Sequence, residues 1–104
     1  MTGAVAGVVD SKLHICGGHG QSTCHVLLGT SWKVQPSLSV DRQFAAGSIT
    51  EDGWLVTGGR DGSGSKLSSS DLYKDGVWTS GPSLHTPTQG HCQVTEGGKV
   101  IVAG

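Results

Sequence analysis

The sequence is poor in charged residues, in aromatic residues and in long apolar runs. Only 14% of its 104 residues are charged, 5% are aromatic, and the formal net charge is −1. An average domain has roughly 25% charged residues, so we find neither the basic patch that binds nucleic acid nor a basic amphipathic stretch for a membrane surface. No apolar run approaches the roughly 20 residues of a membrane-spanning helix. We therefore expect neither a nucleic acid nor a membrane as a partner.

Residues that favour helices are also scarce. Glutamate occurs only at Glu51 and Glu96 and alanine is sparse, whereas 18 residues are glycine. This balance favours short strands joined by turns, so we expect an ordered all-β chain. The N-terminal stretch, residues 1–12, has no Lys or Arg ahead of its apolar run. It is therefore expected to form a strand rather than a targeting peptide.

Apolar segments of strand length alternate with turn signals such as Asp52-Gly53 and Asp75-Gly76. The expected strands are residues 4–9, 13–16, 24–28, 32–34, 44–49, 54–57, 71–74, 77–79, 91–95 and 100–103. The strand at 44–49 and the strand at 91–95 are out of phase in their apolar alternation, which predicts a β-bulge in this part of the pattern.

The sequence of residues 32–58, from Trp32 to Gly58, is repeated in residues 78–104, at a spacing of 46 residues. Seven of the 27 aligned positions are identical, including the Trp and the Pro-Ser-Leu that follows it. A fixed period of this length indicates a repeated structural unit. The units differ in length between their Gly-Gly pair and their Trp, which predicts a constant strand core and a variable loop.

Each unit contains four short strands, with a Gly-Gly pair after the second, an aromatic residue on the third and a Trp on the fourth. This pattern resembles the kelch motif, although Leu27 replaces the usual Tyr in the first unit. The resemblance implies a partial β-propeller made of four-stranded antiparallel blades. Because glycine permits a close approach that a Cβ forbids, we expect each Trp to pack over the gap at a Gly pair. The residues that carry the motif are Gly17, Gly18, Trp32, Gly58, Gly59, Tyr73 and Trp78.

The repeat divides the chain into three units. Residues 1–35 form a first kelch blade, residues 36–81 a second, and residues 82–104 the first two strands of a third. Propellers contain about four to eight blades, and each blade buries its faces against its neighbours. We therefore expect open apolar faces, covered by further blades of a longer chain or by self-association.

The resemblance implies a non-enzymatic role in protein–protein interaction, with a partner that the sequence does not identify. The loops after the second and fourth strands share one face of the molecule, which we call the loop face (residues 19–23, 39–43, 60–70 and 85–88). Loops carry function disproportionately, and the planar guanidinium of Arg suits partner contacts. The candidate partner-binding residues are Arg42, Arg60, Asp61 and His85; the alternative for each is an ordinary solvated loop residue.

Two of the three cysteines flank the first loop. Cys16 and Cys24 align with Thr57 and Ser70 of the next unit, so their side chains could face each other across neighbouring strands. A disulfide would imply an oxidising, extracellular compartment, whereas free thiols would suit the cytoplasm, the default of the kelch family. Both alternatives stay open. Cys92 has no partner in this sequence.

The sequence indicates no catalytic, cofactor or metal site. His19, Cys24 and His25 lie close together, but their spacing matches no familiar zinc arrangement. No set of nucleophile, base and orienting residue stands out, and no helix follows the Gly pairs as in a phosphate-binding loop. The alternatives are a galactose-oxidase-like or sugar-processing enzyme on a kelch-like propeller and, if the disulfide exists, a secreted carbohydrate or matrix binder.

Overall fold

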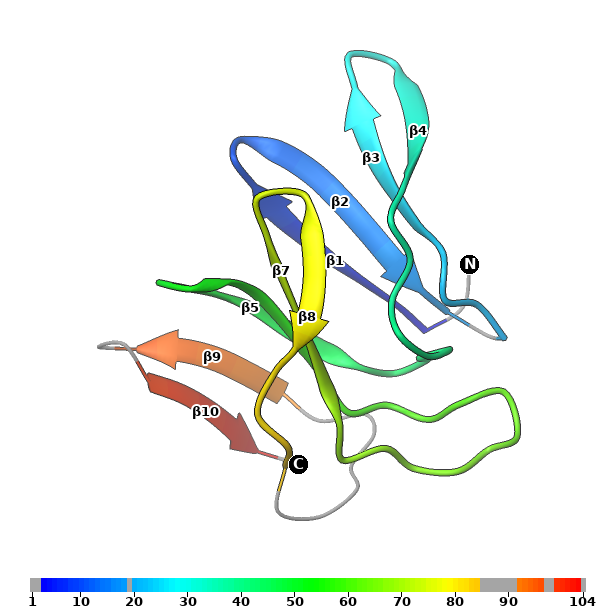
Figure 1. The fold of residues 1–104 in the computed structure, drawn as a ribbon, viewed down its shortest axis with the longest axis vertical. Helices are drawn as coiled ribbons and strands as arrows, with labels where there is room; N and C mark the ends of the chain where they lie inside the picture. The colour runs from blue at the N-terminus through cyan, green and yellow to red at the C-terminus, as the bar shows by residue number, and fades with distance from the viewer. Residues whose placement is uncertain (1–2, 19, 85–91, 97–98, 104) are drawn as a thin grey trace.

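The computed structural model describes residues 3–18, 20–84, 92–96 and 99–103, which form three antiparallel sheets (Figure 1). Strands adjacent in sequence are adjacent in each sheet. The first sheet contains β1 (Ala4–Val9), β2 (Lys12–Gly17), β3 (Cys24–Leu28) and β4 (Ser31–Gln35). The second contains β5 (Ala46–Thr50), β6 (Gly53–Thr57), β7 (Ser70–Lys74) and β8 (Val77–Ser80). A C-terminal hairpin pairs β9 (Cys92–Glu96) with β10 (Lys99–Ala103).

Tight turns join the strands at the end of the sheets opposite the loop face, and we call this end the turn face. Asp10 and Ser11 connect β1 to β2 with φ of 51° and 65°, and Asp75 and Gly76 connect β7 to β8 with φ of 53° and 80°. Two consecutive residues with positive φ match the right-handed twist of a hairpin, and Asp and Gly tolerate that backbone best.

The structure differs from the sequence-based expectation around Phe44. The predicted strand at 44–49 begins only at Ala46, because Phe44 has φ of 58° and donates its backbone N–H to the Gly3 carbonyl at 2.8 Å. The predicted β-bulge is wrong, since the β5–β6 and β9–β10 ladders run without an unpaired residue. β5 packs against β1 on one side and β9 on the other. A strand covered on both faces need not alternate between apolar and polar residues.

The sheets are stacked face to face, as Figure 1 shows for β1, β5 and β9. β1 packs against β5 and β6, and β5 packs in turn against β9 and β10. Gln93 joins the hairpin to the second sheet by donating to Ser48 Oγ at 2.7 Å and to the Leu55 carbonyl at 3.1 Å. Thr57 Oγ1 also donates to Gln93 Oε1. In the part of the chain described, no helix is long and apolar enough to cross a membrane.

Trp54 fills the interface between the first and second sheets. It is 1% exposed and belongs to the main apolar core. A Cβ built on Gly7 of β1 would lie 2.7 Å from Trp54 Nε1, and a Cβ on Gly47 of β5 would lie 2.8 Å from the same atom. The indole therefore occupies the space that two glycines leave open on neighbouring sheets.

The Trp residues of the repeat do not pack on the Gly-Gly pairs, so that expectation is wrong. Trp78 pairs with Tyr73 next to the β7–β8 turn, at the end of the sheet opposite Gly58 and Gly59. Its ring centroid lies 5.0 Å from that of Tyr73 and 5.7 Å from that of Trp54, and its Nε1 donates to the Pro36 carbonyl at 2.9 Å. The antiparallel direction of the strands separates the Trp from the Gly pair.

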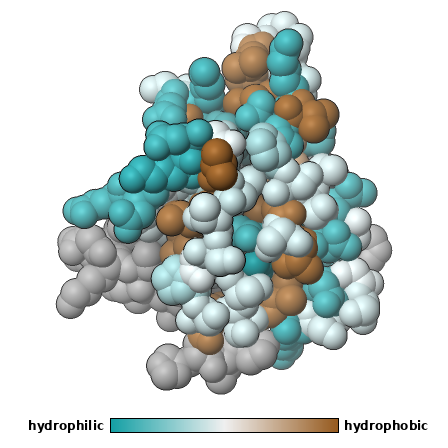
Figure 2. All heavy atoms as spheres, in the orientation of Figure 1, coloured by the Kyte–Doolittle hydropathy of each residue, from teal (hydrophilic) through white to brown (hydrophobic). Residues whose placement is uncertain are grey.

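The first sheet presents its opposite face to solvent. Val8, Leu13, Trp32 and Val34 are exposed there, with Trp32 at 49% and Val34 at 73%. The strand pairing places Leu13, Leu27 and Trp32 at the positions that Trp54, Tyr73 and Trp78 occupy in the second sheet. Figure 2 shows apolar side chains at the surface around the β3–β4 hairpin, at the top of the view. The face that is buried in the second sheet is thus open in the first.

We predict that Gly7→Ala destabilises the chain by about 1–3 kcal/mol, because the new methyl group overpacks a site where the indole of Trp54 has no room to move. Equilibrium unfolding in urea measures the change. Gly62→Ala is the matched control, since its Cβ would meet the half-buried side-chain carboxylate of Asp41 at 3.1 Å and the Gly20 Cα at 4.0 Å. It should change stability by no more than about 0.5 kcal/mol. Equal effects of the two substitutions would contradict the packing described for Trp54.

Candidate functional site

The segment that connects the two sheets passes between their Gly-Gly pairs and organises the loop face. The Arg42 carbonyl accepts from Gly18 N–H at 2.7 Å, and Arg42 N–H donates to the Gln21 carbonyl at 3.2 Å. Gln43 and Arg60 exchange two backbone hydrogen bonds of 3.0 and 2.9 Å. The connection is thereby attached to the loop of the first sheet on one side and to the loop of the second on the other.

The two Gly pairs make this close passage possible. Gly17 and Gly59 have φ of 74° and 87°, a backbone conformation that residues other than glycine rarely adopt. A Cβ on Gly17 would collide with the Arg42 carbonyl oxygen, and a Cβ on Gly59 would lie 2.7 Å from the Gln43 carbonyl oxygen. Backbone of the connection, rather than a Trp ring, fills the gap at each pair.

Arg42 is a buried structural residue, which corrects the expectation that it contacts a partner. The residue is 1% exposed, and its Nε lies 3.2 Å from Oδ2 of the equally buried Asp71. Its Nη1 donates to the carbonyls of Gly58 and Ser69 at 2.8 and 2.9 Å, and its Nη2 donates to Ser69 Oγ at 2.9 Å. Because two loop carbonyls, a loop hydroxyl and a strand carboxylate accept hydrogen bonds from the guanidinium, Arg42 anchors the loop face from below.

Arg60 and Asp61 are half-buried residues of the loop face. The guanidinium of Arg60 stands 5.6 Å from the centre of the Phe44 ring, and Phe44 is 40% exposed. The Asp61 carboxylate accepts from Ser63 Oγ at 2.7 Å and from the backbone N–H groups of Ser63 and Ser65 at 3.0 Å. The hydrogen bond from the Ser63 hydroxyl and those from the backbone lower the pKa of Asp61. His85, the fourth candidate, lies outside the described residues.

Cys16 and Cys24 form a disulfide between β2 and β3, where they are direct partners in the strand pairing. Both residues are 1% exposed. Their equivalents in the second sheet, Thr57 and Ser70, are likewise paired and buried. One unit therefore has a covalent link at the position where the next has two small polar side chains.

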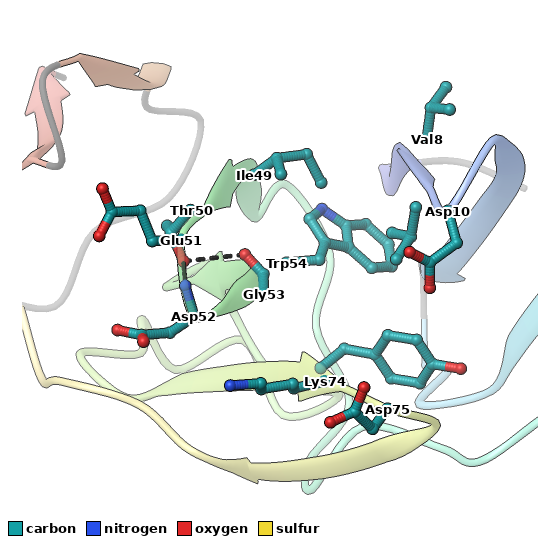
Figure 3. A pocket seen from close by; sticks show the side chains of 12 residues that line it. Val8, Asp10, Ile49, Thr50, Glu51, Asp52, Gly53, Trp54, Lys74 and Asp75 are labelled. Carbon is teal, nitrogen blue, oxygen red and sulfur yellow. Dashed lines mark hydrogen bonds between the residues drawn. The ribbon is translucent and has the colours of Figure 1, made fainter.

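A recess lies at the turn face, between the first and second sheets (Figure 3). It has two adjoining parts of about 260 and 170 Å³, both lined by Val9, Asp10 and Tyr73. The larger part also reaches Trp54, Lys74 and Asp75, and the smaller also reaches Lys12, His14 and Gln35. No group of three or more His, Cys, Asp or Glu residues that could hold a metal ion occurs in the described part of the chain.

His14 lies at the base of this recess. It is 6% exposed, and its ring centroid lies 5.4 Å from that of Tyr73 and 6.1 Å from that of Trp54. Burial of the imidazole lowers the pKa of His14 and is the largest effect. The negative charge of Asp10 raises this pKa to a lesser degree, and the positive charge of Lys12 lowers it further. The sequence reasoning missed this position, because the partners of His14 come from another sheet.

The comparisons with known proteins identify the fold. No family model matches the sequence, and no curated protein matches it. The chain is similar to the solved structure of YjhT, with a TM-score of 0.80 and 15% sequence identity over 97% of this chain and 33% of that one. YjhT has a propeller-like fold, so the two four-stranded sheets are blades of a partial β-propeller. This chain spans one third of the length of that structure.

We predict that Arg42→Met destabilises the chain by about 3–5 kcal/mol, because the buried carboxylate of Asp71 loses its counter-charge. Urea unfolding monitored by Trp fluorescence measures the loss. The double variant Arg42→Met/Asp71→Asn should recover part of it, since no uncompensated charge then remains. A loss below about 1 kcal/mol for the single variant, as for a surface ion pair, would show that Arg42 does not anchor the loops.

We also predict that His14 makes the chain less stable as the pH falls. Because its pKa is lowered in the folded state, the unfolded chain binds the proton first, and stability is lost as the pH drops below the ordinary value of 6.5. Thermal unfolding of wild type and His14→Phe at about pH 7.5 and about pH 5.5 tests this. The variant should lose less stability between the two pH values, and an equal loss would refute the assignment.

Proposed function

We propose that the chain is a kelch-type, non-enzymatic segment of a β-propeller that binds a protein partner through its loop face. The observation that carries the proposal is the platform around Arg42. Buried hydrogen bonds fix the backbone of three loops, while the half-buried Arg60, the exposed Phe44 and the exposed loop after Asp61 face outward. A surface held in place in advance loses little conformational entropy when a partner binds.

The kelch assignment is supported by the two Gly-Gly pairs and by their structural role. In both sheets the pair ends the second strand, has positive φ and admits the backbone of the connecting segment. Tyr73 and Trp78 then form part of the contact with the preceding sheet. Each unit thus uses glycine at the loop end of its sheet, where the connecting backbone passes closely, and the second unit uses aromatic residues at the turn end, where the sheets pack. These two requirements account for the Gly-Gly and aromatic positions of the motif.

The chemistry of the loop face suits a protein surface. Arg60 over the Phe44 ring presents a cation together with an exposed aromatic ring, and these residue types dominate binding energy at protein interfaces. The Asp61 loop that follows consists of Gly, Ser and Lys side chains from Gly62 to Lys66, most of them exposed. Small side chains let the backbone of a partner approach closely. The near-zero net charge does not favour nucleic acid.

We further propose that additional blades, from the same chain or from a second copy, cover the outer face of the first sheet. Leu13, Leu27 and Trp32 occupy the positions of Trp54, Tyr73 and Trp78 in the second sheet, where Trp54 and Tyr73 are buried and Trp78 is partly buried. A contiguous apolar face of this kind marks an interface.

A secreted carbohydrate or matrix binder is the second candidate, and the Cys16–Cys24 disulfide favours it. Disulfides persist mainly in oxidising compartments outside the cytosol. Both candidates share the loop face and differ in where the partner is found. The same experiment can therefore address both if it compares an extracellular fraction with a cytosolic extract.

The test is affinity capture with the immobilised chain, followed by quantitative mass spectrometry of bound proteins. We predict a set of proteins that wild type retains and that Arg60→Ala retains at least about tenfold less, because Arg60 contributes a central contact. Lys33→Ala, an exposed cation on β4 away from the loop face, is the matched control and should behave like wild type. Capture from the extracellular fraction alone would support the secreted candidate.

Two outcomes would contradict the proposed function. The first is a set of proteins retained equally by wild type and Arg60→Ala, since the loop face would then make no contribution. The second is an equal loss with Arg60→Ala and Lys33→Ala, which would indicate nonspecific attraction to positive charge. Circular dichroism of each variant verifies that the fold is unchanged.

A further inference from the structure

The recess at the turn face, which we call the seam groove, crosses the boundary between the first two sheets. Its two parts, of about 260 and 170 Å³, meet at Val9, Asp10 and Tyr73. Their combined volume suits a single long side chain rather than a folded segment. The groove lies at the opposite end of the strands from the loop face, so it is a separate site.

The charges around the seam groove are unbalanced. Four carboxylates line it, whereas Lys12 and Lys74 are its cations. No ion pair within the described residues neutralises any of these carboxylates. In Figure 3, Asp10 lies to the right of the Trp54 indole, Asp75 lies below it, and Glu51 and Asp52 lie to its left. The negative charge is therefore available to a cation from outside. The four carboxylates belong to Asp10, Glu51, Asp52 and Asp75.

The base of the groove offers an additional acceptor that nothing in the fold uses. His14 is 6% exposed, and among the described residues its imidazole makes no hydrogen bond. A buried polar side chain without a partner costs free energy, so it points to a ligand or an ordered water. In its neutral form the ring has one nitrogen that accepts a hydrogen bond. Gln35 Oε1 lies on the same wall, 3.5 Å from Tyr73 Oη.

We propose that the seam groove binds an arginine side chain of a protein partner. A guanidinium has only donors, and the groove supplies acceptors: the Asp10 carboxylate at the shared centre, the free nitrogen of His14 and Gln35 Oε1. The planar group stacks favourably on aromatic rings, which Tyr73 provides. Val9 and Val26 give the aliphatic part of the side chain an apolar wall. The inference rests on the proposed function only in taking the partner to be a protein.

The turns fix the backbone of Asp10, which lines both parts of the groove, and of Asp75, which lines the larger part. Asp10 and Asp75 each stand at the first position of a two-residue turn with positive φ, of 51° and 53°. Asp and Asn both tolerate this conformation. Turn chemistry alone explains an Asp at each position, but it does not explain why both border a groove that ends on an unbonded imidazole. Asp10→Asn thus removes the charge and preserves the turn.

The experiment titrates the full 104-residue chain with N-acetyl-arginine amide and follows amide and imidazole resonances by NMR. We expect millimolar binding, as befits a single side chain, with shifts centred on His14, Tyr73 and Gly76. N-acetyl-citrulline amide has the same shape without the charge and should bind at least about tenfold more weakly. Asp10→Asn should weaken arginine binding about five- to tenfold. Asp52→Asn, which removes the same charge across Trp54, is the control and should change it less than about twofold.

Three results would overturn the proposal. Equal shifts with citrulline amide would mean that the groove takes a neutral polar group. An equal effect of Asp10→Asn and Asp52→Asn would mean diffuse attraction instead of direct pairing. Shifts outside the groove, or none at all, would mean that no arginine site exists there. None of these results bears on the capture of partners through Arg60, so the two proposals fail independently.

Discussion

The insertion of Arg42 and Gln43 between two Gly-Gly pairs is the constraint on which the loop face depends. The backbone of this segment bonds to Gly18 and Gln21 on one side and to Arg60 on the other. The guanidinium of Arg42 then reaches Gly58, Ser69 and Asp71 beneath the loops. Since a buried charge is tolerated only when paired and hydrogen-bonded, this network admits one arrangement of the surrounding backbone. The hydrogen bonds of this segment thereby hold the three loops of the two sheets together as the loop face.

Much of the fold followed from local patterns. Strand-length apolar clusters and turn signals such as Asp75-Gly76 act over a few residues, so the strands and their turns were predicted from sequence, and the resemblance to the kelch motif implied the four-stranded antiparallel blades. Contacts between sheets were not. Arg42 was expected at the surface because loops are usually solvated, yet Asp71 lies on the same side of β7 as the buried Tyr73. The alternation of side chains along β7 therefore indicates that Asp71 points into the core and needs a cationic partner. Only the contact between the two sheets shows that this partner is Arg42.

The repeat explains how one sequence pattern yields different environments. Trp54 replaces the smaller Leu13 of the first unit, and two glycines on β1 and β5, in neighbouring sheets, make room for its ring. The disulfide of the first sheet corresponds to Thr57 and Ser70 in the second. The phase of apolar residues therefore predicted strand positions well and strand irregularities badly, since the β-bulge inferred from alternation is absent from the β5–β6 ladder. The repeat determines the position of each residue in its sheet, and the packing of the adjacent sheet determines which side chain can occupy that position.

The most direct test of the central claim is native-state amide hydrogen exchange, residue by residue. If the inserted segment unites the two sheets, the amides of Gly18, Arg42, Gln43 and Arg60 must exchange as slowly as those in the middle of β6, because all four are bonded and can open only with the sheets. Exchange of these amides at the rate of exposed, unbonded loop amides, with β6 still protected, would contradict the account. The loops would then be attached to the sheets without being organised by them.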